Sequence, residues 1–363
     1  MSEFEEIIRK FQVEGEITGV RPLGHGAVNH TYEIWCGGEA YVLQEINHIV
    51  FRYPVEVMNN LFLVTEYLRK VIEAEGRDPN RETIHFIRTR TGNQLLQTER
   101  GSYFRLYRMI TSGEEMAKPD SAETAYEAGR ILGQFHRRLR DFETRQLSYT
   151  MPKLHDTNKI MSSFVAAVRA DICFRTSDCQ EQIQFVLDRS RKLSLIPDAV
   201  KAGEIPLRVT HNDTHYSNIL VDPDTKKAIC LIDLDTVMPG ASILDFGDCV
   251  RAAAATYDED ERSGDIELDL EMYRFQLQGY ADEMGRVLTD REKELINYAV
   301  WLMCLERGIR YLTDYLNGDR NMTDFSYEQQ NLYRAVNQFF LVLDIEEKED
   351  AMREIAESVF RKI

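Results

Sequence analysis

The order of apolar and polar positions divides the chain into a β-rich first third and a helical remainder. After an opening helix, alternation over residues 17–35 indicates a hairpin, and residues 41–44 resume as a strand after a Gly-Gly turn. Residues 55–73 repeat apolar side chains at helical spacing, whereas residues 84–110 again indicate strands. The first third is therefore expected to be a set of strands with one long helix.

From residue 122 onward the pattern is helical, apart from one short pair of strands after His211. The expected helices cover residues 122–142, 160–170, 180–195, 268–284, 290–316 and 327–359. A chain of 363 residues is longer than one average domain but short for three. The sequence thus predicts an α/β (α+β) protein of two lobes sharing a cleft, with a β-rich lobe at 1–112 and a mainly helical lobe at 113–363.

The most informative polar residues surround the short strands after His211. Asp213 and Asn218 have the separation found in kinase catalytic loops, where the aspartate accepts a hydroxyl proton and the asparagine binds Mg²⁺. A strand, a turn and a returning strand follow and end at Asp233. Such a hairpin places Asp233 beside Asn218, because cross-strand neighbours lie roughly 5 Å apart. An amide oxygen and a carboxylate at that separation can share one hard cation.

A solvated polar turn between two core strands is the alternative, because Asp and Asn are common in turns. It explains the turn but not the joint presence of His211, Asp213 and Asn218. We interpret His211 as a structural histidine that bonds the loop backbone rather than as a proton shuttle. The later segment from Asp245 to Asp248 adds another carboxylate. It either braces the catalytic loop or caps a helix at Asp245.

Two glycines, Gly24 and Gly26, precede Asn29 in the first hairpin, where a Gly-rich loop would bring backbone N–H groups to phosphates. An ordinary hairpin turn is the alternative. A strand follows, which excludes a Rossmann loop. The third strand ends in Gln44, where a protein kinase carries its phosphate-binding lysine, and residues 55–73 offer no obvious glutamate partner. With no APE-type activation segment either, the sequence argues against phosphorylation of proteins.

The composition limits the classes of molecule that the protein is expected to bind. A formal net charge of −17 and a pI near 5.0 disfavour nucleic acid and anionic membranes, although Mg²⁺ can reverse the local field for a phosphate ligand. The six cysteines are scattered without a CxxC pair, so we expect reduced thiols and no zinc site. The sequence shows no signal peptide or apolar run of membrane-spanning length. We therefore expect a cytoplasmic monomer that acts on a small molecule.

Four segments resemble the aminoglycoside phosphotransferase superfamily of protein-kinase-like enzymes and, within it, the N-acetylhexosamine 1-kinases. They are IPLRVTHND (205–213), NILVD (218–222), LIDLDTVMPG (231–240) and LDFGD (244–248). The likeness extends weakly over nearly the whole chain, including residues 155–157 and 310–319. It implies a bilobal kinase-like fold, and phosphorylation of the anomeric hydroxyl of N-acetylglucosamine or N-acetylgalactosamine by ATP with Mg²⁺.

The resemblance also implies a role for particular residues. Asp213 would be the base, with Asn218 and Asp233 as Mg²⁺ ligands. Gly24, Gly26 and Asn29 would cover the phosphates. Gln44 departs from the lysine of the superfamily but is similar to the glutamine that the hexosamine kinases carry at this position. Adenine would contact the backbone of a hinge at 107–111, which includes Met109 and Ile110. Arg310, Asp314 and His155 would contact the sugar, unless Arg310 and Asp314 form a surface ion pair and His155-Asp156 an ordinary capped turn.

Two other functions stay open at this point. One is another phosphotransferase of the superfamily that acts on an amino sugar, an amino alcohol or an amino acid, because an acidic surface suits a cationic acceptor. The other is a nucleotide-binding pseudokinase, which Gln44 favours mildly and which the intact Asp213, Asn218 and Asp233 disfavour.

Overall fold

The computed structural model describes residues 3–23, 28–257, 260–261, 266–320 and 327–363. Contacts group the chain into two units, each built from three segments. Unit 1 comprises Met1–Met116, Arg138–Met151 and Asn218–Pro239, and unit 2 comprises Ala117–Arg137, Pro152–Ser217 and Gly240–Ile363. This grouping differs from the contiguous division expected at 112/113, because two later segments return to the first unit.

Asn60 gives one physical reason for that return. It is buried on the long helix of unit 1, where an amide must find hydrogen-bond partners. Its Nδ2 donates to the carbonyl oxygens of Ser148 (2.8 Å) and Val237 (2.9 Å), and its Oδ1 accepts from the N–H of Ser148 (2.9 Å). One side chain thus fastens both later segments to unit 1.

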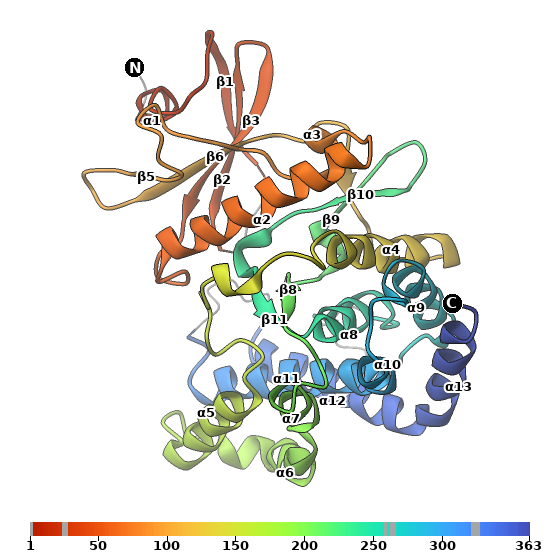
Figure 1. The fold of residues 1–363 in the computed structure, drawn as a ribbon. Helices are drawn as coiled ribbons and strands as arrows, with labels where there is room; N and C mark the ends of the chain where they lie inside the picture. The colour runs from red at the N-terminus through yellow and green to blue at the C-terminus, as the bar shows by residue number, and fades with distance from the viewer. Residues whose placement is uncertain (1–2, 24–27, 258–259, 262–265, 321–326) are drawn as a thin grey trace. The chain divides into compact units, whose positions relative to one another are not determined.

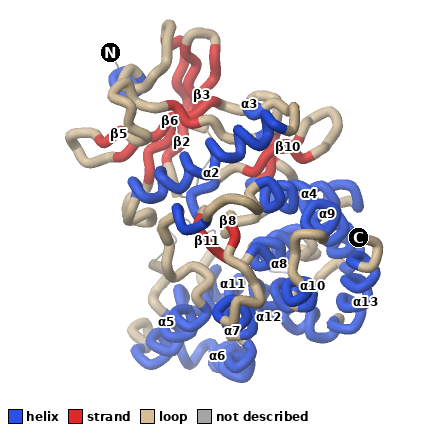
Figure 2. The backbone as a smooth tube through the Cα atoms, viewed as in Figure 1, coloured by secondary structure: helices blue, strands red, loops and turns tan. Residues whose placement is uncertain are grey.

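The antiparallel sheet of unit 1 has the strand order β1-β2-β3-β6-β4, and β5 pairs with β6 (Figures 1 and 2). Its elements are α1 (Glu3–Ile8), β1 (Ile17–Pro22), β2 (His30–Cys36), β3 (Glu39–Ile46), β4 (Phe86–Ile87), β5 (Leu96–Gln97) and β6 (Tyr103–Arg108). Gly37 and Gly38 join β2 to β3 with φ of 60° and 83°, the left-handed backbone that a two-residue hairpin turn requires.

The two faces of this sheet have different partners. Leu43 on β3 and Leu106 on β6 lie in a buried apolar cluster with residues of the N-terminal segment, such as Phe11. Successive side chains of a strand alternate between faces, so Gln44 and Arg105 share the opposite face, where they are direct cross-strand partners. Helix α2 (Pro54–Ala74) also contacts the sheet, since the rings of its Phe62 and of Phe86 on β4 are 5.4 Å apart.

A second, smaller sheet of unit 1 contains the expected hairpin. Strands β9 (Ile219–Val221) and β10 (Ala228–Leu231) pair in antiparallel fashion, and β7 (Glu114–Glu115) pairs with β9. The remaining elements of unit 1 are α3 (Pro79–Glu82), η1 (Thr144–Gln146) and η5 (Leu234–Thr236). At the junctions between the units lie α4 (Ala122–Arg138), η4 (Tyr216–Asn218) and β11 (Met238–Gly240).

Unit 2 is mainly helical (Figure 2). Besides most of α4 it contains α5 (Thr157–Ala170), η2 (Thr176–Cys179), α6 (Gln180–Arg189), η3 (Ser190–Lys192), α7 (Leu195–Lys201), β8 (Arg208–Thr210), α8 (Ser242–Ala253), α9 (Leu270–Met284), α10 (Asp290–Glu294), α11 (Ile296–Leu316), α12 (Gln330–Glu347) and α13 (Glu349–Phe360). No helix among the described residues combines the length and apolar character needed to cross a bilayer.

Helix α8 was not among the expected helices, although a helix capped at Asp245 was one of the two alternatives for this segment. Nearly all its side chains are buried, so it lacks the polar stripe that produces helical periodicity. A Cβ at Gly247 would lie 2.5 Å from the carbonyl oxygen of Ala299, which shows how closely α8 and α11 approach. Two of the expected long helices are interrupted, at Leu295 and at Lys348, because local turns end one helix and begin the next.

Candidate active site

The loop predicted to be catalytic lies in unit 2, where it follows β8 and runs from His211 to Ser217. His211 is completely buried, with its ring 6.1 Å from that of Phe135, which fits a structural role. The side chain of Asp213 is 41% exposed, so a carboxylate between buried neighbours remains within reach of a ligand. Asn212 adopts a positive φ of 65°, a backbone conformation that asparagine tolerates better than most residues.

Asp245 braces this loop. Its carboxylate is 1% exposed and accepts the backbone N–H groups of His211 (2.6 Å) and Asn212 (2.9 Å). Its Oδ2 also lies 3.0 Å from Nε2 of the buried His136. The N-cap of α8 is Ala241, so the interpretation of Asp245 as a helix cap is wrong. The carboxylate instead fixes the backbone immediately before Asp213.

We expect Asp245→Ala to lower the free energy of unfolding by about 2–6 kcal/mol, because two buried N–H groups lose their acceptor at about 1–3 kcal/mol each. Urea unfolding followed by circular dichroism measures the change. The control is Asp350→Ala, which removes a carboxylate that is 83% exposed and should change stability by less than about 0.5 kcal/mol. Equal stability of the two variants would refute the bracing role.

A second buried carboxylate, Asp248, holds cations close to Asp213. It accepts hydrogen bonds from the backbone N–H of Thr214 (3.2 Å), from Arg251 Nε (2.9 Å) and from Arg307 Nη2 (3.3 Å). Burial alone would raise the pKa of Asp248, but the two guanidinium groups outweigh it and hold the pKa well below its usual range. Arg307 Nη2 also lies 3.9 Å from Asp213 Oδ1. The ionised Asp248 therefore anchors a positive charge beside the proposed base.

Helix α11 also carries Arg310 and Asp314, which were expected to contact a substrate. The carboxylate of Asp314 is buried and accepts from Asn331 Nδ2 (3.0 Å). Burial and the neighbouring Arg307 lower the pKa of Arg310. His155 Nδ1 lies 2.9 Å from Glu306 Oε1. Burial disfavours the imidazolium, but the charge of Glu306 outweighs burial and raises the pKa of His155. The sugar contacts of Arg310, Asp314 and His155 stay predictions.

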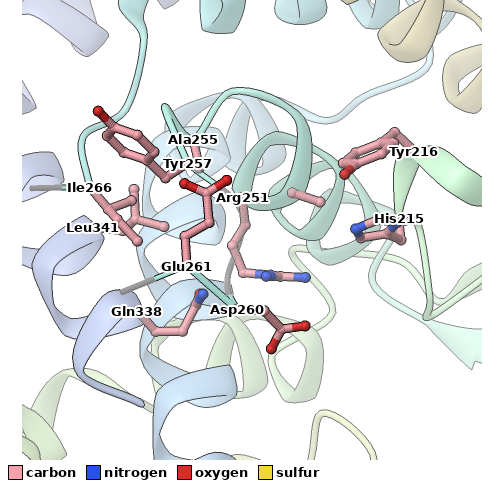
Figure 3. Close-up of a pocket in the computed structure, with 11 residues that line it drawn as sticks. His215, Tyr216, Arg251, Ala255, Tyr257, Asp260, Glu261, Ile266, Gln338 and Leu341 are labelled. Carbon is pink, nitrogen blue, oxygen red and sulfur yellow. The ribbon is translucent and has the colours of Figure 1, made fainter. Parts of the chain in front are cut away.

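A pocket of about 510 Å³ opens next to the catalytic loop in unit 2. Figure 3 shows Arg251 at its centre, with His215 and Tyr216 of the loop on one side and Glu261 on the other. The lining residues are His215, Tyr216, Arg251, Ala252, Ala255, Tyr257, Asp260, Glu261, Ile266, Gln338 and Leu341. Aromatic rings, carboxylates and an amide offer both apolar surface and hydrogen-bond partners to a small polar molecule.

The hairpin of unit 1 contains the two predicted metal ligands. The backbone N–H of Ile232 donates to the carbonyl oxygen of Asn218 (2.9 Å), so Asp233 follows directly after a residue bonded to Asn218. Asp233 has φ 57° and ψ 56°, where η5 begins. An amide oxygen and a carboxylate are the hard donors that Mg²⁺ prefers, so this pair fits the expected cation.

Gln44 lies in a hydrogen-bonded network on the sheet face of unit 1. Its Oε1 accepts from Arg105 Nε (2.9 Å), and its Nε2 donates to Thr31 Oγ1 (3.1 Å). Arg105 forms a buried ion pair with Asp235, whose Oδ2 also accepts from Asn29 Nδ2 (2.8 Å). Gln44 and Asn29 thus belong to one network, whereas Gly24 and Gly26 lie outside the described residues.

The hinge expected at 107–111 begins with the last two residues of β6. The N–H of Met109 donates to the carbonyl oxygen of Ala40 on β3 (3.0 Å), and Ile110 packs against the apolar cluster that contains Leu220 and Ile229. The Met109 N–H is therefore used in bonding to β3, and an adenine contact by this residue would fall to its carbonyl oxygen.

Comparison with known families identifies the chain. Residues 19–285, most of its length, match the model of the phosphotransferase enzyme family (APH). The chain belongs to this family. The match confirms the superfamily that the four segments indicated, and the α/β fold class with a β-rich first unit and a helical second unit is confirmed with it.

Solved structures with the same fold include phosphotransferases for different acceptors. A microcompartment-associated aminopropanol kinase aligns at 16% identity and a TM-score of 0.59, covering 96% of this chain and 98% of that one. An aminoglycoside phosphotransferase from Alicyclobacillus acidocaldarius aligns at 14% identity and 0.60, covering 96% and 95%. An amicoumacin kinase in complex with AMP-PNP, Ca²⁺ and Ami aligns at 13% identity and a TM-score of 0.58, covering 100% of this chain and 94% of that one.

Three polar residues of this phosphotransferase were not singled out from the sequence. Arg307 lies beside Asp213, and Arg105 and Asp235 form the ion pair next to Gln44. Gln44 was the one signal in the sequence for a further cation in unit 1. A neutral residue at the position of the phosphate-binding lysine leaves the positive charge to be supplied by another residue. Finding Arg105 required the strand register, which pairs Gln44 with it.

Proposed function

We propose that this phosphotransferase transfers the γ-phosphoryl group of ATP to a hydroxyl of a small molecule, with the anomeric hydroxyl of an N-acetylhexosamine as the acceptor. The observation that supports it most strongly is Asp213, a half-exposed carboxylate on a loop that buried carboxylates hold in place. The residues similar to N-acetylhexosamine 1-kinases include this loop, the hairpin and part of α11.

The reaction follows from the chemistry of these groups. The acceptor oxygen attacks the γ-phosphorus, the bond between that phosphorus and the β,γ-bridging oxygen breaks, and ADP leaves. The proton of the acceptor hydroxyl passes to Asp213. Asn218 and Asp233 would hold Mg²⁺, which when bound neutralises charge on the phosphates. Because only four residues separate Asp213 from Asn218, chain geometry keeps their Cα atoms within about 18 Å.

The pocket beside the catalytic loop is the proposed acceptor site. It adjoins the loop through His215 and Tyr216, and Arg251 connects it to Asp248. Rings of Tyr216 and Tyr257 can cover an apolar sugar face, while Gln338 can bond hydroxyl or amide groups. The same pocket supports a second candidate. Glu261 would attract a cationic acceptor such as an amino alcohol, the class that the aminopropanol kinase is named for, whereas the nearby Asp260 already pairs with Arg334.

A screen of acceptors distinguishes these candidates. We expect N-acetylglucosamine and N-acetylgalactosamine both to stimulate ADP formation, with phosphorus NMR placing the new phosphate on the anomeric oxygen. Glucose, galactose, an aminoglycoside, aminopropanol and ethanolamine are tested in parallel at equal concentration. Phosphate at the 6-position, or turnover with amines alone, would refute the N-acetylhexosamine assignment while leaving the kinase assignment standing. Nucleotide binding without acceptor-stimulated ADP release would favour a pseudokinase.

A further inference from the structure

The most heavily buried cation near Gln44 is Arg105 on β6, which is 3% exposed. Its two terminal nitrogens donate to the two carboxylate oxygens of Asp235, with Nη2 to Oδ2 at 3.0 Å, and its Nε donates to Gln44 Oε1 at 2.9 Å. Burial alone would lower the pKa of Arg105, but Asp235, with a smaller contribution from Asp233, raises it. The guanidinium therefore stays charged inside unit 1.

This charge determines how the Gln44 amide is oriented. A guanidinium has donors and no acceptor, so the atom of Gln44 that it contacts must be the carbonyl oxygen. The Nε2 group then points away from Arg105 and donates one hydrogen to Thr31 Oγ1 (3.1 Å). An amide that rotated freely could present either end to a ligand. Held by Arg105, Gln44 presents its donor end, the polarity that a phosphate requires.

The same charge restrains the segment that follows the proposed metal ligand. Asp235 lies two residues beyond Asp233 in the chain, in the middle of η5. Asp235 also accepts from Asn29 Nδ2 (2.8 Å), and Asn29 Oδ1 in turn accepts from the N–H of Asn47 (3.0 Å). The residue just after β3 is thus linked through Asn29 to the Asp235 carboxylate in the segment that follows Asp233, and Arg105 neutralises that carboxylate.

We propose that Arg105 is a positioning residue for phosphoryl transfer, which holds Asp233 through Asp235 and fixes Gln44 as a donor at the position of the missing lysine. The proposal rests on the proposed use of ATP. Stability alone does not explain why the Arg105–Asp235 ion pair is present. Apolar residues of similar volume commonly stabilise a core as well as or better than a buried ion pair does. A pair that restrains a catalytic segment and a ligand-facing amide has a functional reason to persist.

Binding of AMP-PNP with Mg²⁺, measured by calorimetry, tests this role independently of the acceptor. We expect Arg105→Met to raise Kd about 10–100-fold, since hydrogen bonds to charged groups have that effect, and to raise the Mg²⁺ concentration for half-maximal turnover. The KM for the acceptor should change less than about twofold, because that site lies in unit 2. The matched control is Arg77→Met, which removes an exposed guanidinium paired with Glu82 in the same unit and should leave Kd unchanged.

Two further variants keep the test decisive if Arg105→Met does not fold. Arg105→Met combined with Asp235→Leu removes both charges and leaves neither unpaired, so the double variant should fold and still bind nucleotide about 10–100-fold more weakly. Gln44→Lys added to Arg105→Met returns a cation next to Asp235 and should recover most of the lost affinity. A folded double variant that binds like wild type, or a Gln44→Lys addition without recovery, would overturn the role of Arg105. Absence of nucleotide binding by the wild-type protein would instead refute the proposed function.

Discussion

Asp213→Asn is expected to lower kcat by about 10²–10⁴-fold with little change in the KM for ATP, because general-base assistance contributes that factor and the phosphate contacts lie elsewhere. The substitution keeps the size and shape of the side chain, but it replaces one acceptor oxygen by an amide donor and removes the basicity. The fold should persist, since Asp245 and Asp248, not Asp213, anchor the loop. Steady-state kinetics with the best acceptor from the screen measure the effect.

Asp350→Asn supplies the control, because it makes the same chemical change at a carboxylate that is 83% exposed on α13. Circular dichroism and urea unfolding establish that both variants are folded. Turnover of Asp213→Asn within a few-fold of wild type would remove Asp213 from the role of base, and the proton would then have to pass to another group.

Asp233→Asn should reduce kcat/KM by about 10³-fold at a fixed Mg²⁺ concentration, since a ligated metal contributes several kcal/mol of charge stabilisation in the transition state. Raising Mg²⁺ should restore part of the loss, because the amide weakens the site without removing it.

Gln44→Ala should cost no more than about 3 kcal/mol of transition-state stabilisation, the upper range for one hydrogen bond to a charged group.

A Mg²⁺ titration of the steady-state rate compares the two variants. Asp224→Asn is the control for Asp233→Asn, because Asp224 lies in the exposed turn of the same hairpin. If Gln44→Ala is as damaging as Asp233→Asn at saturating Mg²⁺, Gln44 does more than donate one hydrogen bond. If Asp233→Asn leaves the Mg²⁺ dependence unchanged, Asp233 is not a ligand of the metal.

Features that depend on local pattern could be predicted from the amino-acid sequence alone. Alternation predicted the strands around Gly37-Gly38, and helical spacing predicted α2. The run from Asp213 to Asp233 predicted a loop and a hairpin, and the backbone bond from Ile232 to Asn218 is the contact that such a hairpin requires. The superfamily followed from these same segments, because the residues that carry the resemblance lie close together in the chain.

The contacts between distant side chains could be identified only in the folded structure. Helix α8 was considered only as a helix capped at Asp245, because burial on all sides removes the periodicity that marks an amphipathic helix. The bonds from Asn60 to Ser148 and Val237, which return later segments to unit 1, join residues far apart in the chain. The pairing of Arg105 with Asp235 depends on strand register, since a shift of one residue would turn Arg105 to the other face of the sheet. Local propensities do not predict such contacts, because the contacts form only when the strands and the later hairpin pack together.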